Sequence, residues 1–220
     1  MSSAGKAILA LLLAGAAAYG DDAYLNSKLA KGQRRIRTAL VLPAEVAIEE
    51  SGQGMWEKSE AFEESFTLLV AKTLSGHGAK VLRAMAGPDA PEEARTAVRE
   101  LEEKLDAMDA TMLRRPEAVV GGHYSLGDGV AGYALTAEAD TIVFVRGSGW
   151  APAAGSGTGR FDGTLTFVDA RSGDVMAYVR FICNSHDWSV DIDYLRPHMI
   201  DTLSELRTPL FDLMGERKKH

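Results

Sequence analysis

Two runs of alternating apolar residues around a short turn constrain the fold of this chain most strongly. TLTFVDA (164–170) and VMAYVRFIC (175–183) flank RSGD, and Gly173 lies within that turn. Two such runs, separated by a short turn that contains glycine, are typical of a β-hairpin. The sequence therefore predicts two adjacent antiparallel strands in its C-terminal half.

Strand-like and helix-like segments alternate upstream of this hairpin. TALVLP (38–43) and AKVLRAM (79–85) are predicted strands, and apolar residues recur at helical spacing between positions 57 and 75. A second amphipathic helix is predicted between Pro91 and Pro116, followed by a strand at TIVFVRG (141–147). This alternation predicts an α/β fold, namely a single-domain sandwich of a mixed β-sheet with packed helices.

The remaining segments carry weaker patterns. EVAIEESGQGMW (45–56) is predicted as a polar connection, and residues 118–126 as either a strand or an extended segment. A short helix is expected near 129–138, a flexible glycine-rich loop at 147–160, and a last helix at 193–208.

The first twenty residues have the pattern of a secretory signal peptide. Lys6 precedes an apolar run of thirteen residues from Ala7 to Tyr19, and Gly20 and Asp21 follow. A bilayer needs roughly 20 apolar helical residues, so this run is too short to span one. We therefore expect cleavage after residue 20, a periplasmic or secreted location, and no stable membrane insertion after cleavage.

The rest of the chain is expected to form one α/β domain at 38–210. A basic segment at 21–37 and a charged tail at 211–220 are expected to be mobile termini.

The net charge of −7 opposes nucleic-acid binding, which depends on neutralising phosphates. Cys183, the single cysteine, excludes an intrachain disulfide, and its apolar neighbours predict a buried core position.

Gly127, Gly129 and Gly132 have the G-x-G-x-x-G spacing of a dinucleotide-binding turn. Such a site also needs a strand leading into the turn and an acidic residue about twenty positions later, where this chain has Arg146. We therefore interpret the glycines, with Gly173, as structural turn residues: Gly132 would let a short helix lie close to the sheet. Nucleotide binding is a minor alternative, and no cofactor is expected.

A second group of residues has metal-binding chemistry, and lies between positions 186 and 198. Imidazole and carboxylate side chains of the kinds that bind zinc occur at His186, Asp187, Asp191, Asp193 and His198. Their spacing matches no established pattern, and Asp191 and Asp193 are also suited to starting a helix. The alternative function is thus a metal-dependent hydrolase that uses His186, Asp191 and His198, while our main interpretation includes no metal.

With the strands placed, the chain resembles a group of bacterial envelope proteins: the curli secretion lipoproteins (CsgG-like), the LpoB-like synthase activators and the TolB amino-terminal domain. The resemblance lies in the opening strand that ends in proline, in Ala139-Asp140 before the middle strand, and in the hairpin segments 167–169 and 172–175. The run YSLGDG (124–129) is also similar to uncharacterised exported bacterial proteins. The resemblance implies an α/β fold and an envelope role. It supplies no catalytic residue, and the chain lacks the lipidation cysteine.

These features together predict a non-catalytic periplasmic accessory or assembly protein that binds another cell-envelope protein. Loops commonly carry recognition, so the 147–160 segment is the candidate contact region, with Trp150 and Arg160 at its margins. The alternative for Trp150 is a side chain that caps the core. The sequence leaves open the identity of the partner and the oligomeric state.

Overall fold

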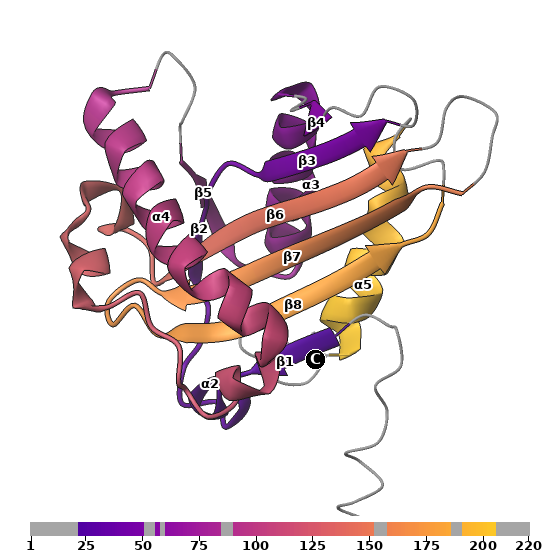
Figure 1. Ribbon diagram of the computed structural model, residues 1–220. Helices are drawn as coiled ribbons and strands as arrows, with labels where there is room; N and C mark the ends of the chain where they lie inside the picture. Colours follow the sequence, from indigo (N-terminus) through magenta and orange to yellow (C-terminus); the bar gives the residue numbers. More distant parts are fainter. Residues whose placement is uncertain are drawn as a thin grey trace, which may run out of the picture.

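The structure, a computed structural model, describes residues 22–50, 56–57, 60–84, 90–151, 158–185 and 191–205. These residues form a mixed eight-stranded sheet with helices on both faces (Figure 1). The predicted α/β fold with a mixed sheet is therefore confirmed. None of the helices described is both long and apolar enough to cross a membrane.

The main path of the sheet combines an antiparallel half and a parallel half. Its order is β1 (Asp22–Leu25), β8 (Val175–Cys183), β7 (Arg160–Asp169), β6 (Thr141–Ala151), β2 (Thr38–Val41) and β5 (Lys80–Arg83). The pairs β1–β8, β8–β7 and β7–β6 are antiparallel, whereas β6–β2 and β2–β5 are parallel. The predicted hairpin is confirmed as β7 and β8.

The polar connection predicted at 45–56 is wrong, because part of it is a strand. β3 (Glu45–Glu50) runs parallel to β6 and pairs with it from Arg146 to Ala151, and β4 (Trp56–Glu57) pairs with β3. β2 pairs with the same edge of β6 only from Thr141 to Val143. The long strand β6 therefore has a second partner along the rest of that edge, and Val46 supplies a buried side chain there.

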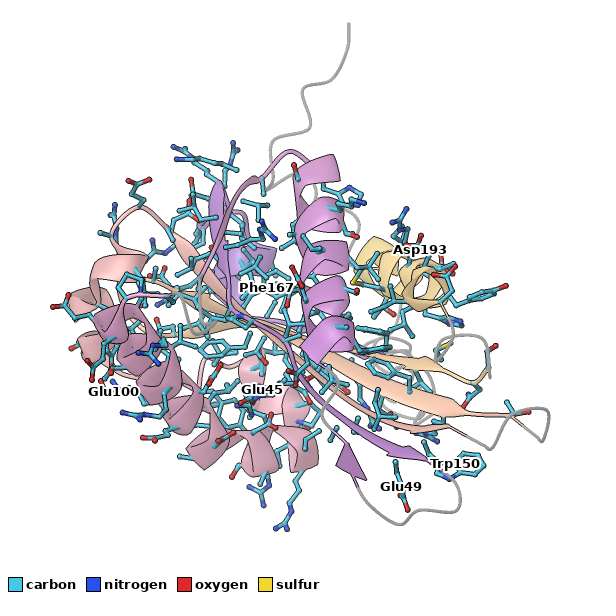
Figure 2. All side chains as sticks on the ribbon, turned by 90° about the horizontal axis from the view of Figure 1, so that it is seen from above. Glu45, Glu49, Glu100, Trp150, Phe167 and Asp193 are labelled. Carbon is cyan, nitrogen blue, oxygen red and sulfur yellow. The ribbon has the colours of Figure 1, made fainter. Side chains whose placement is uncertain are left out.

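Helices cover the two faces of the sheet unequally. α3 (Glu60–Gly76) and α5 (Leu195–Glu205) pack on one face, and α4 (Glu92–Arg114) crosses the other (Figures 1 and 2). Successive side chains of β6 point to opposite faces of the sheet, so the strand contributes to the cores on both faces. Val143 and Val145 join the core with α3 and α5, whereas Ile142 and Phe144 join the core with α4. Cys183 is fully buried among the first set, as predicted.

The expectation that residues 21–37 form a separate mobile segment is wrong for the described part, 22–37. β1 pairs with β8, and the short helix α2 (Ser27–Ala30) follows it. Leu29 and Ile36 are fully buried. Two basic side chains form ion pairs with hairpin carboxylates: Arg34 Nη2 lies 2.8 Å from Asp169, and Lys28 Nζ lies 3.5 Å from Asp174. The basic residues of this segment thus help to fix it to the fold.

Several other segments differ in detail from their predictions. Residues 116–136 contain three short 3-10 helices, η1 (Pro116–Val119), η2 (Asp128–Gly132) and η3 (Ala134–Thr136), and no strand. The predicted 147–160 loop is shorter than expected, because β6 extends to Ala151 and β7 begins at Arg160. The last helix is preceded by a 3-10 turn, η5 (Ile192–Tyr194).

Candidate binding groove on the sheet

A groove of about 520 Å³ lies on the α4 side of the sheet. It is formed by strand residues beyond the part of the sheet that α4 covers, and by the last turns of α4 itself. Its lining residues are Glu45, Val46, Ala47, Asp109, Leu113, Arg146, Gly147, Ser148, Asp162, Thr164 and Arg180. We call this feature the sheet groove. Figure 2 shows Glu45 on the side of the sheet that faces α4.

The sequence of β6 explains why the groove is polar. Side chains at even positions of β6 point to the α4 side, in the order Ile142, Phe144, Arg146, Ser148 and Trp150. The first two are buried beneath α4, and the next two line the groove. The pairing register then places Glu45, Arg146, Thr164 and Arg180 in one row across β3, β6, β7 and β8.

Arg146 holds together three elements at one end of the groove. Its Nε lies 3.3 Å from Glu45 of β3, and its Nη2 and Nη1 lie 2.6 Å and 3.4 Å from Asp106 and Asp109 of α4. Only 14% of the Arg146 side chain is exposed. One guanidinium therefore lies among three carboxylates, an arrangement that we call the Arg146 clasp.

A second charged group lies on β7 and β8. Asp162 accepts hydrogen bonds from Arg160 Nε and Arg180 Nη2, both at 2.8 Å. Burial alone would raise the pKa of Asp162, but the hydrogen bonds and charges of the two arginines outweigh it and lower the pKa below its usual range. Asp162 is thus held ionised between two cations.

Two groups near the Arg146 clasp, the Asp109 carboxyl and the Tyr178 hydroxyl, have raised pKa values because their surroundings do not offset the effect of burial. Burial raises the pKa of Asp109, and the neighbouring Arg146 only partly offsets this effect. Tyr178 of β8 is 2% exposed, and its hydroxyl has no hydrogen-bond partner in the part of the chain that the structure describes. Burial raises the pKa of Tyr178, with a further contribution from the negative charge of Asp109.

Trp150 and Arg160, the predicted contact residues, lie opposite each other on paired strands. Trp150 follows Ser148 on the groove side of β6, pairs in register with Glu49 of β3 and is 40% exposed (Figure 2). The structure therefore brings the two residues together next to the sheet groove, at strand ends rather than on a loop. The groove itself was not predicted, because its residues come from five elements spread between positions 45 and 180.

The glycine motif does not have the geometry of a dinucleotide site. Residues 90–151 are all described, and no strand leads into Gly127. Gly127 and Gly173 have φ angles of +83° and +73°, and Leu126 N donates to Gly173 O at 2.8 Å. A Cβ on Gly173 would overlap the backbone of Gly127. These two glycines pack one turn against another.

The other two glycines of the motif have different surroundings. A Cβ at Gly129 would lie 3.3 Å from Lys104 Nζ, and one at Gly132 would meet nothing within 4 Å. The expectation that Gly132 allows close packing on the sheet is therefore wrong.

The residues of the metal hypothesis are only partly described. His186 and Asp187 lie outside the described residues. Asp191 accepts a hydrogen bond from Asp193 N at 2.9 Å, and Asp193 pairs with Arg196 at 2.9 Å. Among the residues described, no group of three His, Cys, Asp or Glu side chains is placed to hold a metal ion. The hydrolase with His186, Asp191 and His198 stays a prediction, which elemental analysis of the purified protein would test.

No protein-family model matches the chain, and no curated protein sequence matches it. Similar solved structures include the PelC dodecamer from Paraburkholderia phytofirmans (13% identity, TM-score 0.41, covering 90% of this chain and 98% of that one). They also include lipoprotein GNA1162 from Neisseria meningitidis, at 12% identity and a TM-score of 0.37, covering 79% of this chain and 98% of that one. A third is the hypothetical protein CT253 from Chlamydia trachomatis, at 10% identity and a TM-score of 0.41, covering 83% of this chain and 99% of that one. At these values the similarities establish no activity for this chain.

Proposed function

We propose that this protein is a non-catalytic accessory protein of the bacterial cell envelope that binds another envelope protein through the sheet groove and Trp150. The observation that carries the proposal is the part of the sheet that α4 leaves uncovered: it forms a groove, and a half-exposed tryptophan lies beside it. Tryptophan and arginine are enriched among the residues that contribute most to protein–protein binding. The secretory pattern of residues 1–20 supports an envelope location.

The charges of the groove favour binding over proton-transfer chemistry. Arg146 contacts three carboxylates, and Asp162 accepts hydrogen bonds from two arginines that lower its pKa and hold it ionised. A general acid or base works best with a pKa near the working pH, whereas the pKa of Asp162 is lowered. Asp162 thus offers a fixed negative charge to a partner, whereas burial raises the pKa of Asp109.

A photo-crosslinking amino acid at position 150 tests this function in intact cells. We expect it to capture an envelope protein that can be identified by mass spectrometry. Tyr194 is the matched control, because it is also an exposed aromatic residue, at 50%, but belongs to η5, which packs with α3 and α5. Equal capture from positions 150 and 194, or none from position 150, would contradict the proposal.

A further inference from the structure

The Arg146 end of the sheet groove carries more negative charge than its own residues neutralise. Glu45, Asp106 and Asp109 all contact the same guanidinium, and the structure shows no other ion pair for them in the residues that it describes. Their side chains are 41%, 63% and 24% exposed, so all three are accessible from solvent. Three carboxylates with one cation leave a surplus of two negative charges at this end, and the two arginines around Asp162 offset one of them.

A buried hydroxyl without a partner among the described residues, that of Tyr178, belongs to β8 two residues before the groove residue Arg180, on the face of the sheet that α4 covers. The side chains that act electrostatically on the Tyr178 hydroxyl include Asp109, Arg180 and Arg146, and all three line the groove. A buried polar group without a hydrogen bond costs free energy, so it favours any ligand that supplies one. The phenol oxygen can accept a hydrogen bond from a cation that enters beside Asp109, provided that the Arg146 clasp shifts to admit it.

Exposed apolar side chains accompany this charge. Leu113 lines the groove from α4 and is 50% exposed, and Trp150 lies further along β6 at 40%. Arginine and lysine combine an apolar stem with a charged head, so they suit a site that joins apolar walls to carboxylates. The net charge of −7 also attracts cationic partners over longer distances.

We infer that the sheet groove receives an arginine or lysine side chain from the partner protein. The charged head lies among Glu45, Asp109 and the Tyr178 hydroxyl, and the segment that carries it contacts Leu113 and Trp150. This inference rests on the proposed binding function and specifies the chemistry of the partner. A protein segment fits better than a small cation, because the exposed leucine and tryptophan gain from apolar contact.

The test uses a fluorescein-labelled peptide of alternating leucine and arginine, and the same peptide with neutral citrulline for arginine. Fluorescence anisotropy measures binding to the wild type, to the groove variant Glu45→Gln/Asp109→Asn, and to a control variant, Glu64→Gln/Glu103→Gln. The control removes two exposed carboxylates outside the groove lining, so it matches the change in net charge. We expect about tenfold weaker binding of the arginine peptide to the groove variant than to the control, since charge-assisted contacts are lost.

Tyr178→Phe separates binding from folding. It removes a hydroxyl that has no partner, so the melting temperature should not fall, whereas binding of the arginine peptide should weaken about threefold or more. Equal binding of the arginine and citrulline peptides, equal binding by the groove and control variants, or no peptide binding would overturn the inference. A response to spermidine or Mg²⁺ but not to the peptide would overturn it as well.

The crosslinking experiment distinguishes this failure from failure of the function. Capture through position 150 that is unchanged in the groove variant would leave the proposed function standing and overturn the cationic specificity. Absence of capture from position 150 in otherwise wild-type protein would overturn the function itself.

Discussion

Gly147 and Gly163 lie opposite each other in β6 and β7, and an aromatic ring covers each of them. A Cβ at Gly163 would overlap the ring of Phe181, and one at Gly147 would overlap the ring of Phe161. Both rings are fully buried in the core beneath α3, where they pack with Phe66 of that helix, so they have little room to move. Here glycine provides space for a neighbouring side chain rather than a turn.

Gly163→Ala should therefore destabilise the protein by about 1–3 kcal/mol, because overpacking forces the ring of Phe181 to shift. Gly132→Ala is the matched control, since its Cβ would enter open space at an ordinary φ angle, and we expect no loss there. Urea unfolding of the two variants measures the difference. Equal midpoints would contradict the packing argument.

The glycine motif should also respond unequally to alanine. Gly127→Ala places a Cβ at φ +83° and should cost on the order of 1 kcal/mol, whereas Gly129→Ala meets only the flexible end of Lys104 and should cost much less. Thermal unfolding of both variants tests this order. A larger loss at Gly129 than at Gly127 would show that the turn geometry is not the constraint.

Two groove carboxylates should affect stability with opposite dependence on pH. The pKa of Asp162 is lowered by folding, so its stabilising effect is present above the unfolded value of about 4 and is lost as the pH falls through the folded pKa. The pKa of Asp109 is raised, so the folded protein binds the Asp109 proton more tightly than the unfolded chain does. The contribution of Asp109 to the free energy of unfolding therefore declines as the pH rises through the folded pKa.

Replacing each carboxyl by its amide, as Asp162→Asn or Asp109→Asn, removes that dependence. Relative to wild type, the stability deficit of Asp162→Asn should shrink as the solution is acidified, and Asp109→Asn should gain relative stability as the pH rises. Unfolding free energies between pH 3 and pH 7, extracted from urea curves, give both slopes. Parallel slopes for the two variants would contradict the assignment.

At the scale of elements, the Arg146 clasp joins α4 to β3 and β6. Arg146→Met keeps much of the side chain's volume but leaves three carboxylates without their cation, so we expect a loss of about 1–3 kcal/mol. Faster amide exchange should appear first in residues 106–114. Arg196→Met is the control, because it breaks only an exposed pair with Asp193 and should cost well below 1 kcal/mol. Similar losses of stability in Arg146→Met and Arg196→Met would contradict a special role for the Arg146 clasp.

Periodicity predicted most of the long elements, and its failures have local causes. The alternation of 164–183 and the apolar stripe of 92–114 correspond to β7, β8 and α4. β3 was missed because its three glutamates gave the segment a polar composition, although Val46 and Ile48 alternate with Glu45 and Glu49. The segment 22–37 looked like a mobile terminus because its basic residues find their carboxylate partners more than 130 positions away, at Asp169 and Asp174.

At the scale of the whole molecule, the groove was harder to predict than the sheet. The β6 strand does contain its signal, since the groove side changes from Ile142 and Phe144 to Arg146 and Ser148. Recognising a site from this change also requires knowing where α4 ends over the sheet and which strands lie beside β6. Those facts depend on pairings between distant segments, which periodicity does not reveal. The role of Trp150 and Arg160 as contact residues stays a prediction, and the structure shows the two residues opposite each other on paired strands.

The pairing of β1 with β8 has a consequence for the order in which the molecule assembles. The Asn26 side chain reaches Val175 across 149 positions, and β1 has no other strand beside it in the described sheet. A ribosome delivers the amino-terminal strand first, yet its partner is among the last to emerge. The β7–β8 hairpin closes over a short turn, whereas β1 must close a loop of most of the chain, so we expect β1 to dock after the hairpin has formed. Completion of this edge therefore requires that the chain has been made as far as β8, which ends at Cys183.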